Sequence, residues 1–501
     1  MAEEIFDVPL ASPLDYRPSA TVGGLSVPPT TLPALASGSS NCLFESEGAV
    51  KRPAFKSNAT SPVSNPTTGV GTWSTNYYSV ISGTGVYKNA TGPVIGAVGG
   101  SVGDYYSVAS AVPVEGLMFL DGKAKLGDRY DAGTFSAIVD ATWTGTIAPN
   151  LAAASNCVCL NGTFYVMDKL GHIWGSSAST LNTAANWDAT NVINAWNDSS
   201  VAMSLAVYRN NLIAFKQNGL EVFYDAGIFP GSSLAPNQAI RSEYGLYDPA
   251  SVAQVDASMF WVGTEQGLNI VVCRMTGAQF EKISTPAVER ILYYYLQGLN
   301  IGQSVAGLVW GCAITFPGHS VYCISSLLVP FVLCFDTRSQ QWGIWNFIPS
   351  SRIPNYLPFV GSAFRAVGTG TAIFTYQAGL ISTRVDEFAD NVWDYTNSVN
   401  VVDGIQSELV TQQVNCGTDT YKVCSRLTVL SDQAVNGDLD VAWSDDDMKS
   451  WSSWQTMDLT GDQFFLTDLG TFKRRQFRFK QRSSTPLRIK SVKMHCFVGA
   501  I

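Results

Sequence analysis

The sequence has few charged residues, few histidines and no long hydrophobic run, and each shortage excludes a class of protein. Charged residues make up 14% of the 501 residues and hydrophobic residues 46%, which excludes an intrinsically disordered chain. No stretch of 18 apolar residues occurs, so we expect no membrane-spanning segment. The three histidines, His172, His319 and His495, each stand alone in an expected strand or turn, which argues against a histidine-based catalytic site.

The cysteine pattern and the charge balance exclude further classes. The ten cysteines form no Cys-x-x-Cys pair, so we expect no zinc site and interpret them as buried, reduced thiols of a protein made in a cytoplasm. The first ten residues are acidic and lack the apolar core of a secretion signal. The formal net charge is −9, whereas a protein that grips DNA by neutralising phosphates is normally basic. We expect DNA to pass such a surface without tight or sequence-specific binding.

What the sequence does contain is a series of hairpin signals. Residues 208–227 form two apolar, aromatic-rich runs joined by Asn218-Gly219, a pair that tolerates positive φ at both positions and so predicts a tight β-hairpin. Comparable turns recur every 40 to 57 residues, at Asp121-Gly122, Asn161-Gly162, Asn218-Gly219, Gln266-Gly267, Pro317-Gly318 and Thr369-Gly370. Propeller blades repeat every ~40–50 residues. The fold class is therefore all-β, with a β-propeller of about six divergent blades, within a range of five to seven.

Composition divides the chain into three expected parts. Residues 1–65, rich in Pro, Ser and Gly, are either an extended N-terminal arm or a disordered tail; residues 66–400 are the propeller body; residues 401–501 are a C-terminal β-sandwich or platform. One helix is predicted inside the propeller. Thr285 is its N-cap, Pro286 its first residue and Glu289 part of its first turn.

The C-terminal part carries the basic residues and a turn motif. Basic and apolar residues alternate around Arg478 and Lys480, so this strand presents one basic face. That face is either a solvated edge that deters aggregation or a contact for an acidic partner or the DNA backbone. Residues 444–451 resemble an Asp-box, a hairpin turn in which a carboxylate accepts backbone N–H groups, although Met448 replaces the usual glycine. This motif is structural and indicates no catalysis.

Several short stretches, taken in order, resemble the tail hub or nozzle proteins of short-tailed bacteriophages, also known as packaged-DNA stabilisation proteins or tail accessory factors. These stretches are Glu47–Pro53, Tyr208–Phe215, Leu220–Tyr224, Tyr244–Leu246, Phe260–Gly263, Val288–Leu292, Phe335-Asp336 with Trp342, and Arg474–Phe479. They spread over about half of the chain, and their order carries more weight than any one of them. The Gly/Ser-rich region 60–110 and the Asp-box-like turn depart from the family pattern.

The resemblance implies a structural virion protein without enzymatic activity, catalytic residues, cofactor or metal. It implies a propeller body and six copies in a ring attached below portal and adaptor proteins, with tail fibres or spikes as further neighbours. The ring retains packaged DNA and conducts it on ejection. The candidate interaction residues are Lys51, Arg52, Arg474, Arg475, Arg478 and Lys480.

Two alternatives stay open at this point. A propeller glycosidase acting on host surface glycans predicts an arginine cluster facing paired carboxylates at the propeller centre. A carbohydrate-binding adhesin predicts exposed aromatic residues in blade loops, for which Trp187 and Trp196 are the candidates.

Overall fold

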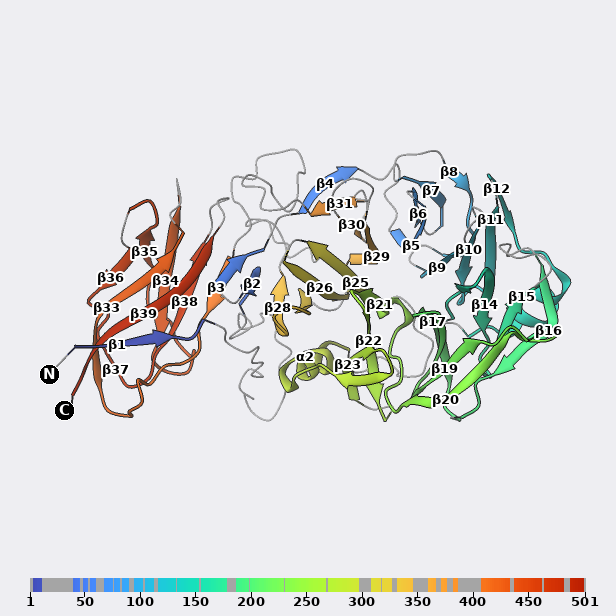
Figure 1. Ribbon diagram of the computed structural model, residues 1–501. Helices are drawn as coiled ribbons and strands as arrows, with labels where there is room; N and C mark the ends of the chain where they lie inside the picture. Colours follow the sequence, from blue (N-terminus) through green and yellow to red (C-terminus); the bar gives the residue numbers. More distant parts are fainter. Residues whose placement is uncertain are drawn as a thin grey trace, which may run out of the picture.

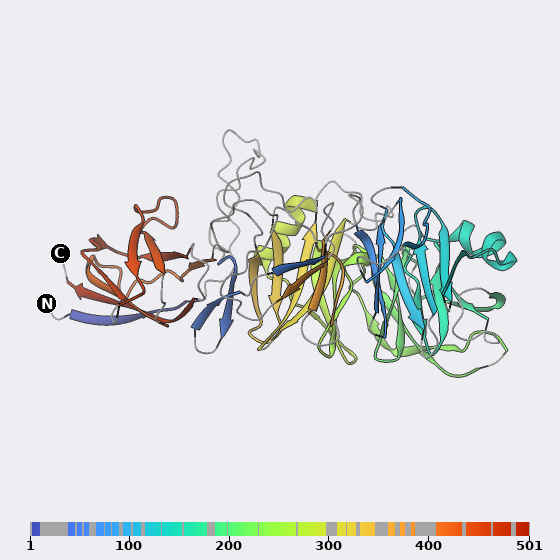
Figure 2. The same ribbon diagram turned by 90° about the horizontal axis from the view of Figure 1, so that it is seen from above.

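The structure is a computed structural model that describes residues 3–10, 39–177, 186–296, 308–345, 359–385 and 407–499, with shorter gaps inside these ranges. Figures 1 and 2 show two bodies side by side in an elongated molecule, a propeller and a smaller sandwich. The N-terminal strand β1 lies in the sandwich beside the last strand, β39, so both ends of the chain meet in the same sheet.

The larger body contains, within the described residues, seven four-stranded antiparallel sheets, which we number as blades 1 to 7 (Figure 1). Blade 1 consists of β5 (Thr67–Trp73), β6 (Asn76–Ile81), β7 (Gly85–Lys88) and β8 (Val94–Gly96). Blade 2 consists of β9 (Ser107–Ala111), β10 (Gly116–Asp121), β11 (Leu126–Asp131) and β12 (Thr134–Ala137). Blade 3 consists of β13 (Val158–Leu160), β14 (Thr163–Met167), β15 (His172–Ser176) and β16 (Trp187–Asn194).

The later blades follow the same order along the chain. Blade 4 consists of β17 (Ala202–Tyr208), β18 (Asn211–Lys216), β19 (Leu220–Asp225) and β20 (Leu234–Ser242). Blade 5 consists of β21 (Ala253–Val255), β22 (Ser258–Glu265), β23 (Asn269–Thr276) and β24 (Gln279–Lys282). Blade 6 consists of β25 (Val309–Phe316), β26 (His319–Ser326), β27 (Val332–Asp336) and β28 (Gln341–Trp345). Blade 7 consists of β29 (Phe359–Arg365), β30 (Thr371–Thr375), β31 (Ser382–Val385) and β4 (Phe55–Ala59).

Blade 7 closes the ring with a strand from the other end of the chain. Its first strand, β29, packs against both β25 of blade 6 and β5 of blade 1. Its fourth strand, β4, pairs with β31, with Ser57 opposite Thr383 and Phe55 opposite Val385. Because β4 precedes blade 1 in the sequence, this pairing ties the last blade to the start of the propeller. The described strands therefore form seven blades, at the upper end of the range expected from the turn spacing.

Burial explains why the blade strands are so apolar. Strands β10 and β26 are buried at every residue, because a neighbouring blade covers each face of their sheets. Hydrophobic clusters fill the spaces between consecutive blades, for example Phe260, Tyr322 and Phe335 between blades 5 and 6. Burial of apolar surface between the blades stabilises the fold by about 25 cal/mol per Å², and this is the main favourable contribution to folding.

The hairpin turns match the predictions in part. Asn161 and Gly162 join β13 to β14 with φ of 49° and 82°, as a two-residue turn with positive φ at both positions requires. The prediction for Asn218-Gly219 is wrong in its geometry, because neither residue has positive φ. Instead, the two-residue turn of that region is Arg209-Asn210, with φ of 46° and 60°. Gly219 is needed for another reason, since a Cβ there would lie 2.8 Å from the Ser242 carbonyl oxygen. Thr369-Gly370 lies outside the described residues.

The sandwich consists of two facing sheets (Figure 2). One contains β32 (Ser407–Val410), β38 (Gln476–Gln481), β34 (Asp438–Ser444) and β35 (Gln455–Asp458). The other contains β2 (Cys42–Glu45), β3 (Gly48–Lys51), β39 (Arg488–Val498), β33 (Lys422–Ser431) and β36 (Phe464–Thr467), with β1 (Glu3–Val8) paired to β39 and β37 (Thr471–Phe472) paired to β33. Alternate residues such as Val441, Phe477 and Met494 fill the core. Strands β1 to β4 thus all come from the segment expected to be an extended arm.

Helical structure is short. Helix α2 (Pro286–Leu296) begins as predicted, with the Val288 N–H donating to Thr285 Oγ1 at 3.4 Å and the Ser284 hydroxyl donating to Glu289 Oε1 at 2.9 Å. Its buried face packs on blade 5. Among the described residues, the other helical turns are the π-helical η1 (Trp143–Ile147), α1 (Ala148–Asn150) and the 3₁₀ turn η3 (Pro249–Ser251).

Candidate functional site

The basic residues selected from the sequence lie in the sandwich and where it meets blade 6. Lys51 and Arg52 are both buried at the end of β3. Arg52 Nε donates to Asn41 Oδ1 at 2.8 Å, and its guanidinium carbon lies 5.2 Å from the centre of the Trp345 ring in β28. A buried guanidinium that is hydrogen-bonded and stacked on an aromatic ring holds elements together. Arg52 therefore connects the sandwich to blade 6.

Arg474 and Arg475 are adjacent but differ completely in environment. Arg475 is 1% exposed, and its Nε and Nη2 donate to the two oxygens of Asp445 at 2.7 Å each. Its Nη1 also donates to the Leu469 carbonyl at 2.8 Å, so the guanidinium is fully engaged. Arg474 is 53% exposed and donates to Asp447 Oδ2 at 2.7 Å. Of this pair, Arg474 is the one that solvent or a partner reaches.

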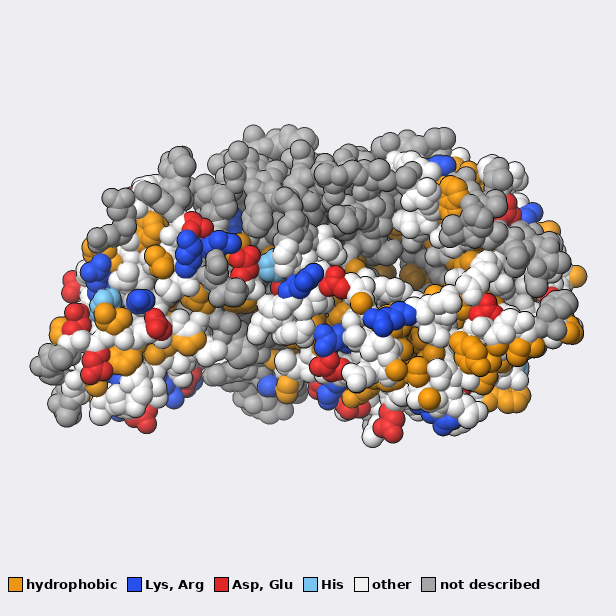
Figure 3. Space-filling view, in the orientation of Figure 1, with side chains coloured by type: hydrophobic (Ala, Val, Ile, Leu, Met, Phe, Trp, Pro, Cys, Tyr) orange, Lys and Arg blue, Asp and Glu red, His pale blue; other side chains and the backbone are white. Residues whose placement is uncertain are grey.

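Arg478 and Lys480 lie on the same face of β38, as the alternation predicts. Arg478 makes a two-point ion pair with Glu408, with donor–acceptor distances of 2.5 and 2.8 Å. The Arg478 guanidinium also stacks on Trp451 and Trp454, 5.6 and 5.2 Å from the ring centres. Lys480 is partly exposed, opposite Glu408 in β32. Figure 3 shows basic and acidic side chains interspersed over the visible face of the sandwich, so this face has no large patch of one sign.

Residues Ser39–Asn41 form the junction between propeller and sandwich. The Ser40 N–H donates to the Glu408 carbonyl of β32 at 2.8 Å, and the Asn41 N–H donates to the Ile344 carbonyl of β28 at 2.8 Å. A single stretch of backbone thus lies between blade 6 and the sandwich and hydrogen-bonds to both. Because backbone groups buried here need partners, this pairing fixes where β2 begins.

His319 lies at this junction, and sequence reasoning missed its contacts. Its Nδ1 lies 2.7 Å from Asp336 Oδ2 in blade 6, and its Nε2 lies 3.4 Å from Glu45 Oε1 in β2. Arg488 of β39 then donates to Glu45 Oε2 at 3.0 Å. Burial alone lowers the pKa of His319, but the hydrogen bonds and charges of Asp336 and Glu45 outweigh it and raise the pKa above 6.5.

Each histidine is the only one in its strand, as expected, but each also has a polar partner. His319 joins two carboxylates, and His172 Nδ1 lies 2.7 Å from Asp168 Oδ2. His495 Nε2 lies 3.4 Å from the Thr428 hydroxyl on the neighbouring strand. The carboxylate that partners His172 is only four residues away, so a search for His–Asp pairs at short spacing could have found it. Glu45 is 274 residues from His319, and no local signal points to it.

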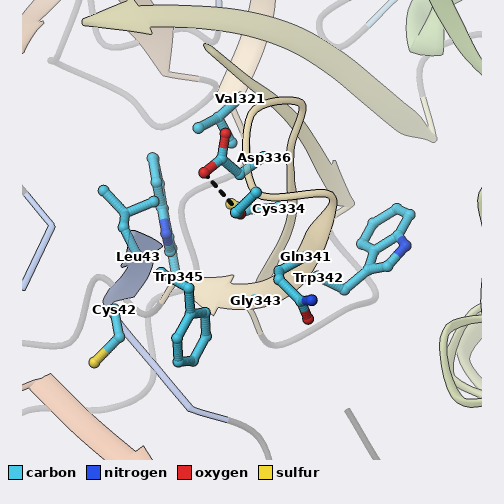
Figure 4. Close-up of a pocket in the computed structure, with 11 residues that line it drawn as sticks. Cys42, Leu43, Val321, Cys334, Asp336, Gln341, Trp342, Gly343 and Trp345 are labelled. Atoms are coloured by element: carbon cyan, nitrogen blue, oxygen red, sulfur yellow. Dashed lines mark hydrogen bonds between the residues drawn. The ribbon is translucent and has the colours of Figure 1, made fainter. Parts of the chain in front are cut away.

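A small cavity lies between β2 and blade 6 (Figure 4). It is bordered by Leu43 from β2 and by Cys334, Asp336 and Trp345 from blade 6. Its volume is about 10 Å³, room for about one water molecule. The Ser339 hydroxyl donates to Asp336 Oδ2 at 2.9 Å, the contact drawn as a dashed line in Figure 4. The cavity is a packing feature of the junction and is too small for a substrate.

The Asp-box-like turn has the geometry expected of that motif. Asp446 Oδ1 accepts the Ser450 N–H at 2.9 Å and the Ser444 hydroxyl at 2.8 Å, and Asp446 Oδ2 accepts the Ser450 hydroxyl at 2.5 Å. These hydrogen bonds, led by that of the Ser450 hydroxyl, lower the pKa of Asp446 to about 2. Met448, at the usual glycine position, has a φ of 64°. The turn joins β34 to β35 and has a structural role.

The two tryptophans proposed for glycan contact differ in exposure. Trp187 is 4% exposed and packs on Trp143, with ring centres 4.9 Å apart, so it belongs to the core between blades. Trp196 is 65% exposed beside the His172 ring, 6.1 Å between centres. Of the two, only Trp196 is placed to touch a partner.

The described part of the chain lacks two further features. No group of three or more His, Cys, Asp or Glu side chains there is arranged to hold a metal ion. No helix among those residues is long and apolar enough to cross a membrane.

Comparison with known families identifies the propeller. The family model described as "Bacteriophage P22 Gp10, beta-propeller" matches residues 45–362, a span that contains blades 1 to 6 completely and begins at β2. The chain belongs to this phage stabilisation family. It is therefore a phage tail β-propeller protein of the Gp10 type. The C-terminal sandwich beyond residue 362 lies outside the match, as does strand β1.

Other comparisons add only distant likenesses. A search of curated proteins gave no match. Among solved structures, a catalytically inactive variant of virginiamycin B lyase from Staphylococcus aureus, with quinupristin, has a TM-score of 0.43 at 10% identity, over 66% of this chain and 99% of that one. The N-terminal domain of Nup159 has a TM-score of 0.38 at 10% identity, over 70% and 99%. YCF48 bound to D1 peptide has a TM-score of 0.38 at 12% identity, over 68% and 99%.

Proposed function

We propose that this chain is a structural, non-enzymatic subunit of a short phage tail. About six copies form a ring, the nozzle or hub, which retains packaged DNA and conducts it on ejection. The observation that carries the proposal is the family match over residues 45–362, because it spans six complete blades in order. Portal and adaptor proteins above the ring and tail fibres or spikes beside it are the proposed partners, and the virion tail is the proposed location after synthesis in the host cytoplasm.

The electrostatics support passage of DNA rather than adhesion to it. The net charge is −9, and Arg475 and Arg478, two of the six candidate interaction residues, are each paired at two points with a carboxylate. A guanidinium already engaged in this way has few free donors for phosphate. Arg474 and Lys480 keep exposed surface, so we propose them, rather than the buried Lys51, Arg52 and Arg475, as contact points for a neighbouring protein.

Retention of DNA can be tested on particles assembled without this chain. The measurement is the fraction of heads whose genome survives nuclease treatment, with and without purified chain added back. The proposal predicts a several-fold loss of protected genome and its recovery on addition. Equal protection in both preparations would contradict a role in retention.

A further inference from the structure

An unpaired, fully buried carboxylate oxygen lies where blade 1 meets blade 2. Asp121, the last residue of β10, is 0% exposed. Its Oδ1 accepts the N–H groups of Lys123 and Ala124 at 3.0 and 2.9 Å, whereas its Oδ2 has no hydrogen-bond partner. A buried charged oxygen without a partner costs several kcal/mol unless a cation or a proton compensates it.

Other oxygen atoms, from the connection between β8 and β9, lie near Asp121 Oδ2. A methyl group on Gly100 would lie 2.6 Å from Asp121 Oδ2, 3.0 Å from the Tyr106 hydroxyl and 3.5 Å from Asp104 Oδ2. Gly100 has a φ of +78°, which favours glycine, and it leaves room for these oxygens to approach the backbone. The Tyr106 hydroxyl donates to the Gly99 carbonyl at 2.5 Å, which brings a fourth oxygen to the group.

The nearby positive charge pairs with Asp104 and leaves Asp121 Oδ2 without a hydrogen-bond partner. Lys123 Nζ lies 2.6 Å from Asp104 Oδ1, and the Ser101 N–H donates to Asp104 Oδ2 at 2.7 Å. Asp128 in β11, on the same hairpin as Asp121, is a further buried carboxylate.

We propose that Asp121 and Asp104, with the Gly99 carbonyl and water, bind one calcium ion between blades 1 and 2. Calcium takes six to eight oxygen ligands in irregular geometry, including carboxylates, carbonyls and water. Magnesium requires near-octahedral geometry and fits this mixed set less well. Gly99 and Gly100 are exposed, so the site lies beside the surface of the propeller. The bound ion fastens the β8–β9 connection to the β10–β11 turn.

The first test uses the intact chain after treatment with a chelator. Terbium replaces calcium and emits when a tyrosine lies close to it, and Tyr106 is placed to sensitise it. We expect one saturable terbium site per chain, displaced by calcium with a dissociation constant of about 10⁻⁴ to 10⁻³ M, because only two carboxylates supply charge. Calcium is also expected to raise the melting temperature, whereas magnesium at the same concentration raises it less.

Two substitutions decide whether Asp121 and Asp104 hold the ion. Asp121→Asn keeps the acceptor for the Lys123 and Ala124 N–H groups, so the turn retains its hydrogen bonds, and we expect calcium affinity to fall at least tenfold. The matched control is Asp131→Asn in the same hairpin, where the carboxylate pairs with Arg129 at 2.7 Å; its affinity is expected to match that of the unaltered chain. If Asp121→Asn does not fold, Asp104→Asn replaces it, with the same loss expected.

Several outcomes would overturn the calcium proposal. If a proton rather than a cation compensates Asp121, calcium leaves the melting temperature unchanged and Asp121→Asn stabilises the chain. Absence of saturable terbium binding, or unchanged affinity in the substituted chains, would also overturn the proposal.

Discussion

His319 and Asp336 form a buried pair across two neighbouring strands of blade 6, with Nδ1 and Oδ2 2.7 Å apart and each side chain no more than 5% exposed. Through Glu45 the pair reaches β2 of the sandwich. A contact of this kind makes the attachment of the two bodies depend on the charge of one imidazole.

We predict that the contribution of His319 to stability declines as pH rises. Its pKa is raised above 6.5, since Asp336 and Glu45 outweigh the effect of burial, so its stabilisation is fully present below 6.5 and is lost as pH rises through the folded-state pKa. Burial raises the pKa of Asp336, but His319 and the Arg338 N–H outweigh it, so that carboxyl contributes above 3.8 and less as pH falls. The difference in melting temperature between the unaltered chain and His319→Gln should be larger at pH 6 than at pH 9.

The control for this prediction is His172→Gln. His172 also pairs with an aspartate at 2.7 Å, but it is 27% exposed and joins no second body. We expect a smaller loss there, and protease cleavage between propeller and sandwich should increase only in His319→Gln. An equal, pH-independent loss in both variants would contradict a specific role for the His319 pair.

The adjacent residues Arg474 and Arg475 allow an exposed arginine to be compared with a buried one. Arg475→Ala removes a buried cation with its hydrogen bonds to Asp445 and to the Leu469 carbonyl, and Asp445 is exposed enough to be solvated, so we expect a loss of about 1.5–3 kcal/mol. Arg474→Ala removes an exposed ion pair and should cost less than about 1 kcal/mol. Denaturant unfolding of the sandwich, followed by tryptophan fluorescence, measures both; similar losses would show that burial does not set the difference.

Met448→Gly should stabilise the Asp-box-like turn. Met448 holds a φ of 64°, which costs a non-glycine residue roughly 1 kcal/mol, and glycine adopts it freely. We expect a gain of about 0.5–1 kcal/mol in the same unfolding assay. Asp446→Ala is the opposite change, since it removes the acceptor of three hydrogen bonds, and it should destabilise. A loss of stability in Met448→Gly would mean that its side-chain packing outweighs the backbone strain.

Ring closure by β4 can be tested by replacing residues 55–59 with a glycine-serine segment of equal length. Because β4 is the only described partner on that edge of β31, we expect amide exchange in Ser382–Val385 to accelerate at least tenfold. Replacing Val94–Gly96, the outer strand β8 of blade 1, in the same way serves as the control and should leave exchange in β31 unchanged. Unaltered exchange after loss of β4 would contradict its role as the closing strand.

Local patterns predicted the local structure well. The cap at Thr285 and the turn at Asn161-Gly162 depend on residues within a few positions, and both are found as expected. Alternation also placed Arg478 and Lys480 on one face of β38. The φ values at Asn218-Gly219 were not predictable, because the adjoining strand β20 and the close approach of Ser242 decide them.

Contacts between segments that are distant in the sequence could not be predicted. Glu3 lies opposite Phe497 and Ser57 lies opposite Thr383, and no local sequence pattern predicts either pairing. The four strands of the N-terminal segment were therefore not predicted. The blade without a turn in the expected series is blade 1, β5 to β8, which lies in the Gly/Ser-rich region 60–110. From the sequence, Arg475 could not be distinguished from the neighbouring basic residues. Arg475 is buried because it pairs with Asp445, which lies 30 residues earlier in the sequence. Domain boundaries at residues 65 and 400 stay a prediction.

The central claim is that this chain is a ring subunit of the virion tail. The most direct test is peptide quantification of the chain in purified, nuclease-treated particles of its virus. The account predicts about six copies per particle. Absence of the chain from particles would contradict it.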